Sequence, residues 1–292
     1  MVAGSVGDRP EPYRSADARL DVGYADVPGA RLYYELAGRG EPLVLTPGFS
    51  LDTRMWDDQL TPFADRYRVL RYDPRGFGRS SEPGSEPYSH SEDLRALLAG
   101  LGIDRAHIVG LSLGGGTAID FALTYPESTH SLITVDSTLS GFPWSDAFIA
   151  PIKACSAVAR AESVEAARRT WLRHPLFTAT HRDERALAAL RRMVADYSGW
   201  HWLHRDPRQT PDPPALHRLA RLTMPTLAIV GEHDMPDFHA IAGLVAERAP
   251  HASKVVLPGV GHLANMEAPE VFTEVVLGFL TSASPRAEGV GL

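Results

Sequence analysis

Short apolar runs alternate with amphipathic segments along most of the chain. The runs are five to seven residues long and rich in β-branched residues, as strands are. The segments between them place apolar side chains three and four positions apart, as helices do. The predicted strands span residues 31–37, 42–46, 67–73, 106–112, 131–136, 225–231 and 253–259. Strands that alternate with helices predict a mainly parallel sheet covered by helices on both faces.

Two stretches depart from this alternation. Residues 19–37 carry strand-like runs without a helix between them, which predicts an antiparallel edge. Residues 138–218 carry helical patterns and a proline-rich end but no strand-like run, which predicts a helical insertion over one end of the sheet. The predicted organisation is a flexible segment 1–18, an α/β core of 19–137 and 219–282, a helical insertion 138–218 and a flexible tail 283–292.

Composition and charge narrow the class of protein. The net charge is −7 and the 29 Lys and Arg residues are scattered, so no basic face for nucleic acid is predicted. The first twenty residues contain no apolar run, and no apolar stretch approaches the length of a membrane span. The single cysteine, Cys155, cannot form an internal disulfide, which suits a reducing compartment. We expect a cytoplasmic, enzyme-sized protein that binds neither nucleic acid nor membrane.

The segment VGLSLGGG, residues 109–116, places one serine among four glycines between a predicted strand and a predicted helix. Gly110, Ser112 and Gly114 match the G-x-S-x-G pattern, in which a strained turn exposes a nucleophilic serine. A phosphate-binding loop would need lysine where Gly116 stands, which disfavours a nucleotide site. A tight turn with an incidental serine is the other alternative at this stage.

A serine nucleophile needs a base, and a carboxylate normally orients that base. His262 follows the last predicted strand and a glycine-rich turn, and Asp234 follows the strand before it. This gives the order serine, acid, histidine that the G-x-S-x-G hydrolases use. Asp136, at the end of another predicted strand, and Asp237, in the same loop as Asp234, are alternative acids.

Together these motifs resemble the α/β-hydrolase superfamily, and in particular its small bacterial carboxylesterases, enol-lactonases and meta-cleavage-product hydrolases. The supporting segments are LVLTPGFSLDTRMWDDQL, YRVLRYDPRGFGRSSEP, HIVGLSLGGGTAIDFALTYPE, PTLAIVGEHD and LPGVGHLANMEAPEVF. The resemblance implies a mostly parallel, eight-stranded sheet. It also implies an oxyanion hole formed by the backbone N–H groups of Phe49 and Leu113. One departure is Pro47, which stands where relatives usually carry histidine and has no N–H.

The resemblance further implies that residues 138–218 form a cap over the nucleophile. Trp200 and Trp202 would line the substrate pocket or pack the cap onto the core. His201 and His204 have a helical spacing that can hold a metal, but no carboxylate or cysteine partner is evident. We therefore expect no metal and no cofactor. We expect Cys155 to be a packing residue.

The predicted function is cofactor-free serine hydrolysis of a small-molecule carboxylic ester or lactone, through an acyl-enzyme. The same three residues could instead support C–C bond hydrolysis of the meta-cleavage type or cofactor-free perhydrolysis. A ligand-binding protein without catalytic activity is the alternative outside enzymes. The sequence leaves the physiological substrate open, and it leaves a homo-oligomer open as well.

Overall fold

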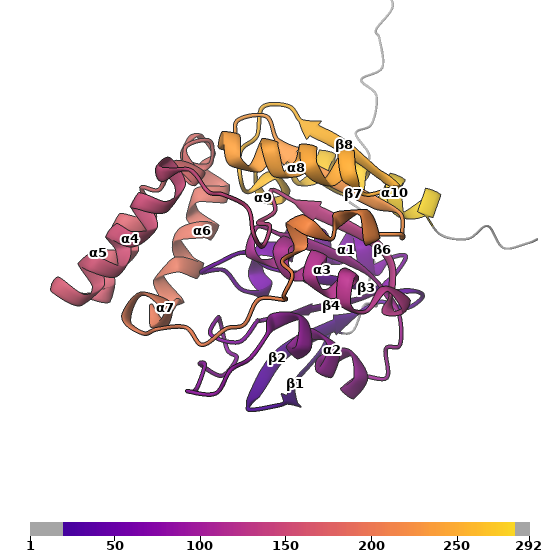
Figure 1. Cartoon of the computed structure of the whole chain (residues 1–292), viewed down its shortest axis with the longest axis horizontal. Helices are drawn as coiled ribbons and strands as arrows, with labels where there is room; N and C mark the ends of the chain where they lie inside the picture. The colour runs from indigo at the N-terminus through magenta and orange to yellow at the C-terminus, as the bar shows by residue number, and fades with distance from the viewer. Residues whose placement is uncertain (1–19, 284–292) are drawn as a thin grey trace, which may run out of the picture.

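The computed structural model describes residues 20–283. An eight-stranded sheet with the strand order β1-β2-β4-β3-β5-β6-β7-β8 forms its centre (Figure 1). The strands are β1 (Asp21–Val27), β2 (Ala30–Ala37), β3 (Pro42–Thr46), β4 (Arg68–Tyr72), β5 (Ala106–Leu111), β6 (Thr129–Val135), β7 (Thr226–Gly231) and β8 (Ala252–Leu257). The predicted α/β fold with a mostly parallel, eight-stranded sheet is confirmed.

Pairing direction and burial both change across the sheet. β1 pairs with β2 and β2 with β4 in antiparallel fashion, whereas every pairing from β4 through β8 is parallel. All residues of β5 and β7 are buried, as expected of strands with helices on both faces. β1 alternates between exposed and partly buried residues, which is typical of an edge strand. The expected antiparallel edge is therefore present.

Helices cover both faces of the sheet (Figure 1). α1 and α10 contact each other and lie on β4 and β6, while α2 contacts α3, α3 lies on β5 and β6, and α8 lies on β7 and β8. The core helices are α1 (Asp57–Ala64), α2 (His90–Gly100), α3 (Leu113–Thr124), α8 (Pro236–Arg248), α9 (Ala264–Glu267) and α10 (Pro269–Ala283). No helix within residues 20–283 has both the length and the apolar character that crossing a membrane requires.

The segment between β6 and β7 is helical, and the structure describes all of it without a strand. Its helices are α4 (Asp146–Ala161), α5 (Val164–Trp171), α6 (Glu184–Asp196) and α7 (Trp200–Leu203), which lie together at one side of the sheet (Figure 1). α6 shows why these helices form. The Asp183 carboxylate caps its first turn, and its buried residues recur at helical spacing. The limits of this helical insertion, residues 138–218, stay a prediction.

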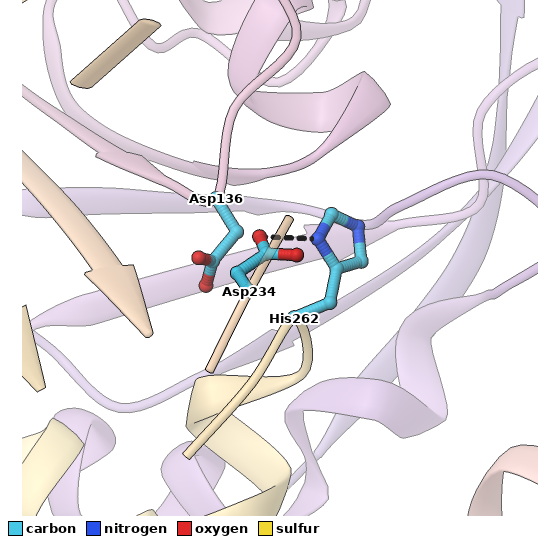
Figure 2. Close-up of side chains that lie close together, drawn as sticks. All are labelled: Asp136, Asp234 and His262. Atoms are coloured by element: carbon cyan, nitrogen blue, oxygen red, sulfur yellow. Dashed lines mark hydrogen bonds and ion pairs between the residues drawn. The ribbon is translucent and has the colours of Figure 1, made fainter. Parts of the chain in front are cut away.

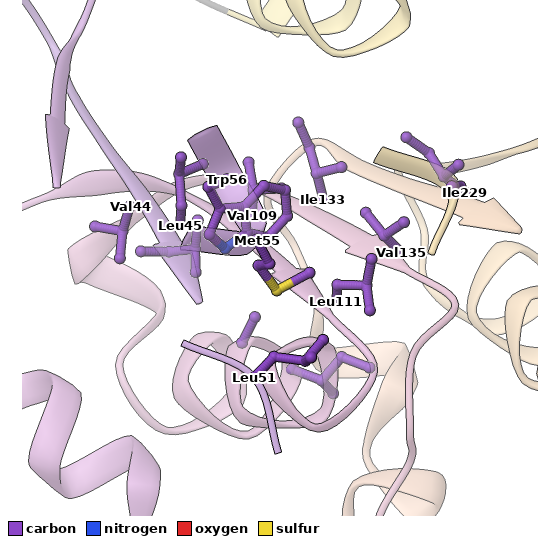
Figure 3. Close-up of a cluster of buried hydrophobic side chains, with 14 of the residues drawn as sticks. Val44, Leu45, Leu51, Met55, Trp56, Val109, Leu111, Ile133, Val135 and Ile229 are labelled. Atoms are coloured by element: carbon purple, nitrogen blue, oxygen red, sulfur yellow. The ribbon is translucent and has the colours of Figure 1, made fainter. Parts of the chain in front are cut away.

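The hydrophobic core fixes the ends of the central strands. Side chains from β3, β5, β6 and β7 pack together with Met55 and Trp56 of the short helical turn after β3 (Figure 3). Both of these side chains are almost fully buried, at 2% and 0% exposure. Burial of such a side chain stabilises a fold by about 1.5–3 kcal/mol. The carboxyl ends of these strands are thus rigid platforms for the loops that follow. The segments 1–18 and 284–292, predicted to be flexible, lie outside the described residues.

Candidate active site

Ser112 lies on a strained turn between β5 and α3. Its backbone has φ 55° and ψ −115°, a conformation that costs a residue with a side chain about 1–3 kcal/mol. Hydrogen bonds hold it there: the Ser112 N–H donates to the Val135 carbonyl at 2.9 Å, and the Ser112 carbonyl accepts from the N–H groups of Gly116 and Thr138, each at 3.0 Å. The turn is therefore maintained by β6 and by the first turn of α3.

The glycines around Ser112 are required by the space available. A Cβ at Gly110 would overlap the carbonyl oxygen of Gly114, and a Cβ at Gly114 would overlap the carbonyl oxygen of Thr46. A Cβ at Gly115 would lie 2.5 Å from the Ser137 hydroxyl. The strand, turn and helix approach too closely for any larger residue, so the chain accepts glycine at a helix start, where it is otherwise unfavourable.

His262 and Asp234 form a buried hydrogen-bonded pair. Asp234 follows β7 and His262 follows β8, so two neighbouring strands bring them together. The His262 Nδ1 lies 2.9 Å from the Asp234 Oδ2 (Figure 2). The other carboxylate oxygen accepts from the Met235 N–H at 2.7 Å. A carboxylate on Nδ1 assigns the proton to that nitrogen and leaves Nε2 as the basic atom.

Ser112 and His262 line the same cavity, which has a volume of about 460 Å³. Within residues 20–283, neither the Ser112 hydroxyl nor the His262 Nε2 makes a hydrogen bond. The structure thus brings the two groups to one wall without joining them. Catalytic hydrogen bonds are often long in unliganded enzymes and shorten when substrate binds.

Asp136 adds a third carboxyl group to this arrangement (Figure 2). It is fully buried at the end of β6, with φ 43°, and its Oδ1 accepts from the Gly231 N–H at 2.8 Å. Among residues 20–283, no group donates a hydrogen bond to its Oδ2. Burial, and secondly the Asp234 carboxylate, raise the pKa of Asp136 well above its usual value. The raised pKa favours the protonated form of Asp136, which is able to donate a hydrogen bond to Asp234.

The alternative acids have other partners. Asp234, and not Asp136, contacts the His262 Nδ1. Asp237 accepts from the N–H and the hydroxyl of Ser145, at 2.8 and 2.7 Å, so it binds the start of α4. Of the three aspartates considered from the sequence, Asp234 alone is placed to orient the histidine.

Asp136, Asp234 and His262 also have the composition of a metal site, since one ligand atom of each lies within 4.8 Å of the others. Two carboxylates and an imidazole are a donor set that divalent metals accept. However, the His262 Nδ1 and the Asp234 Oδ2 contact each other directly, so a cation would have to replace that hydrogen bond. These contacts fit a histidine base that a carboxylate orients better than they fit a set of metal ligands.

Phe49 and Leu113, the residues expected to form the oxyanion hole, both line the cavity that holds Ser112. Leu113 is the first residue of α3, where an N–H has no partner within the helix. The Phe49 N–H donates no hydrogen bond among the described residues, whereas the preceding N–H, of Gly48, lies 3.4 Å from the Met55 sulfur. Both N–H groups are therefore without an acceptor among the described residues, and the α3 N-terminus adds a positive partial charge near Ser112. That they form an oxyanion hole stays a prediction.

The loop that carries Phe49 lies directly against Ser112. A Cβ at Gly48 would be 3.4 Å from the Ser112 Cβ, and the Pro47 carbonyl oxygen would be 2.6 Å from a Cβ at Gly114. Pro47 thus presents a carbonyl to the turn, and its missing N–H removes neither of the two free donors. The unusual proline is compatible with the site.

Trp200 and Trp202 are not among the residues that line the cavity. Trp202 is 1% exposed and packs edge-on against Tyr197 and near Phe49. Trp200 stacks on His204, with ring centroids 5.0 Å apart. Both tryptophans therefore pack within the protein, which is one of the two roles considered from the sequence. Trp202 lies toward the loop that carries Phe49, and Trp200 lies against His204.

Other aromatic residues of the insertion form the cavity wall. Trp144, Phe148 and Trp171 line it. Trp144 stacks on Phe148 at 4.1 Å, and the Trp171 indole N–H donates to the Ser50 hydroxyl at 2.7 Å. The sequence pattern did not single out these residues. A signal was present in Trp144, which follows β6 closely and so must lie near the carboxyl end of the sheet.

The fold and the site describe a hydrolase of the α/β class, and the comparisons agree. Residues 41–269 match the family described as the alpha/beta hydrolase fold, so the chain belongs to that family.

Three relatives illustrate the range of the family. The chain is similar to the 2-hydroxy-6-oxononadienedioate/2-hydroxy-6-oxononatrienedioate hydrolase of Burkholderia vietnamiensis, with 30% identity over 86% of this chain and 91% of that protein. It is 28% identical to the pimeloyl-[acyl-carrier protein] methyl ester esterase of Aeromonas hydrophila, over 84% and 98% of the two chains. The solved enol-lactonase of Burkholderia xenovorans has 27% identity and a TM-score of 0.73, over 89% and 100%.

Proposed function

We propose that this protein is a serine hydrolase that cleaves a carboxylic ester or lactone through an acyl-enzyme. The observation that carries the proposal is the buried His262–Asp234 pair, which shares a cavity with Ser112 on its strained turn. The names of the related esterase and enol-lactonase support this substrate class.

In the proposed reaction, the His262 Nε2 takes the proton of the Ser112 hydroxyl as the oxygen attacks the carbonyl carbon. The carbonyl oxygen becomes negative and accepts from the Phe49 and Leu113 N–H groups, each worth about 3–4 kcal/mol in such sites. The bond to the leaving alcohol breaks, and the alcohol takes the proton from His262. Water then repeats the sequence on the acyl-enzyme, releasing the acid and free Ser112. Throughout, the Asp234 carboxylate stabilises the protonated imidazole.

We also propose that the helical insertion, residues 138–218, is the cap of this site. Trp144, Phe148 and Trp171 from the insertion give the cavity an apolar roof, which would exclude bulk water from the acyl-enzyme. The Trp171–Ser50 hydrogen bond fixes this roof to the loop that carries Phe49.

A pre-steady-state experiment with p-nitrophenyl acetate tests the proposed function. The wild-type protein should release a burst of p-nitrophenol equal to the enzyme concentration, and Ser112→Ala should abolish it. Thr178→Ala, at an exposed threonine, controls for the loss of a hydroxyl elsewhere. Hydrolysis that persists unchanged in Ser112→Ala would refute the nucleophile.

The similarity to the dienedioate hydrolase favours C–C bond hydrolysis as a second candidate. It would use the same three residues on a carbon–carbon bond beside a ketone. Turnover of a lactone and ester panel, compared with turnover of a coloured dienoate, separates the two. Activity on the dienoate alone would replace the first proposal with the second.

A further inference from the structure

The cavity has a polar end that the proposed ester cleavage does not use. His90 and Arg208 both line the cavity that holds Ser112, although they come from α2 and from the loop after α7. Neither residue forms part of the Ser112, Asp234 and His262 arrangement. Their side chains have a feature in common, which is that neither makes a hydrogen bond to another group within residues 20–283.

His90 is 6% exposed, and both of its ring nitrogens are buried without a hydrogen-bond partner among residues 20–283. Burial lowers the pKa of His90 well below its usual value, and the Arg208 guanidinium lowers it further. The ring is therefore neutral and offers one N–H donor and one bare nitrogen. A buried polar group without a partner is unfavourable, so such a group on a cavity wall indicates a ligand that completes its hydrogen bonds.

Arg208 carries a positive charge at the same end. None of its side-chain N–H groups donates a hydrogen bond within the described part of the chain. The nearest carboxylate, of Asp206, lies 3.8 Å from its Nε, and its side chain is 34% exposed. Its backbone is held by a bridge to Tyr88, and the next residue donates to the Tyr88 carbonyl at 2.7 Å. The guanidinium is thus attached to an ordered strand-like segment. Its Nε faces Asp206, and its two terminal nitrogens have no hydrogen-bond acceptor within the described residues.

The N-terminus of α2 opens on the same end, since Ser89, His90 and Ser91 all line the cavity. The first N–H groups of an eleven-residue helix favour a negative ligand. Two carboxylates oppose a negative ligand: Asp206, 3.8 Å from the Arg208 Nε, and Asp120, which lines the cavity. Burial raises the pKa of Asp120 to about 6, and its carboxylate already accepts from the Ser140 hydroxyl at 3.2 Å.

We propose that this polar end binds a carboxylate, so that the substrate is an ester or lactone that carries a second, free carboxylate. The Arg208 guanidinium and the His90 N–H donate to its oxygens, and the α2 N-terminus adds to the attraction. The identity of the cleaved bond rests on the proposed function, whereas recognition of the carboxylate does not.

Matched substrates test this inference. Mono-p-nitrophenyl esters of adipate, suberate and sebacate carry a free carboxylate, and the hexanoate, octanoate and decanoate esters have the same chains without it. For the best chain length, the wild type should show a higher kcat/KM for the carboxylate ester. Arg208→Gln should lower the ratio of the two kcat/KM values roughly tenfold, the effect of losing a hydrogen bond to a charged group at a partly exposed site.

Arg205→Gln is the matched control, because Arg205 is exposed in the same loop but does not line the cavity. It should leave the ratio unchanged. His90→Phe removes the ring nitrogens and fills the same space, and it should lower the ratio without lowering the melting temperature. An equal wild-type preference for both esters, or an equal fall in Arg208→Gln and Arg205→Gln, would overturn the inference.

Calorimetric titration with suberate, which has no bond to cleave, separates the two proposals. Tighter binding of suberate to the wild type than to Arg208→Gln would support carboxylate recognition, whether or not any ester is cleaved. If suberate binds in this way but every ester is left intact, the proposed function alone is refuted. Ester turnover that depends on Ser112, together with suberate binding that is absent or indifferent to Arg208, would refute carboxylate recognition alone.

Discussion

Replacing Asp136 by asparagine tests the charge state of the carboxyl pair beside His262. Ligand atoms of Asp136 and Asp234 lie within 4.8 Å of each other, where two negative charges would repel by about 3.5 kcal/mol at an effective dielectric constant of about 20. This repulsion favours a proton on one of the two groups. The pKa of Asp136 is the one raised, by burial and by Asp234. Asparagine copies the neutral acid, since its oxygen can accept from the Gly231 N–H and its amide can donate to Asp234.

The difference in stability between Asp136→Asn and the wild type should depend on pH. An unfolded chain ionises Asp136 above a pKa of about 3.9, whereas the folded protein holds the proton to higher pH, so the wild type loses stability as pH rises toward the folded-state pKa. The asparagine variant has no such loss. The free energy of unfolding should therefore shift in favour of the variant as pH rises from about 4.5 to about 6.5, by at most about 1.4 kcal/mol per pH unit.

Urea unfolding at these two pH values measures the shift. Asp104→Asn, at an exposed aspartate, controls for the removal of one carboxyl group. The kcat/KM of Asp136→Asn should also stay within about threefold of the wild type, because the charge on Asp234 is unchanged. A stability difference that is the same at both pH values would refute the assignment of a neutral Asp136.

Three further predictions follow from the site. Asp234→Asn should lower kcat by roughly 10⁴-fold while the protein stays folded, because it favours the wrong tautomer of the base; a loss below tenfold would exclude Asp234 as the orienting acid. Gly114→Ala should cost about 2 kcal/mol or more in urea unfolding, since its Cβ would overlap the Thr46 carbonyl, and a neutral effect would contradict the packing around the turn. Relative to the wild type, the free energy of unfolding of Asp120→Asn should rise by about 2–3 kcal/mol from pH 4 to pH 7, because the pKa of Asp120 is raised to about 6. A difference between the two proteins that does not change with pH would contradict the burial of Asp120.

Most of the fold could be predicted because the sheet is buried and its pattern is local. The run PLVLT coincides with β3. The other predicted strands differ from the observed ones by one or two residues at one or both ends. The order of Ser112, Asp234 and His262 could be predicted as well, since each follows a strand and neighbouring parallel strands end at the same edge.

The cavity wall could not be predicted, because it depends on how the insertion folds back. Trp200 and Trp144 are both aromatic residues of the insertion, yet only Trp144 reaches the cavity. The role of His90 was also hidden, since a histidine at a helix start is ordinary in sequence. What distinguishes it is the absence of partners for its ring nitrogens, and that is a property of the tertiary structure.

The central claim is that Ser112 attacks the substrate with the help of His262. The most direct measurement is labelling with a fluorophosphonate, followed by mass spectrometry of the intact protein and of its peptides. We expect one adduct per chain, located on Ser112, with labelling at least about a hundredfold slower in His262→Ala. An adduct on another residue, or labelling at an undiminished rate in that variant, would contradict it.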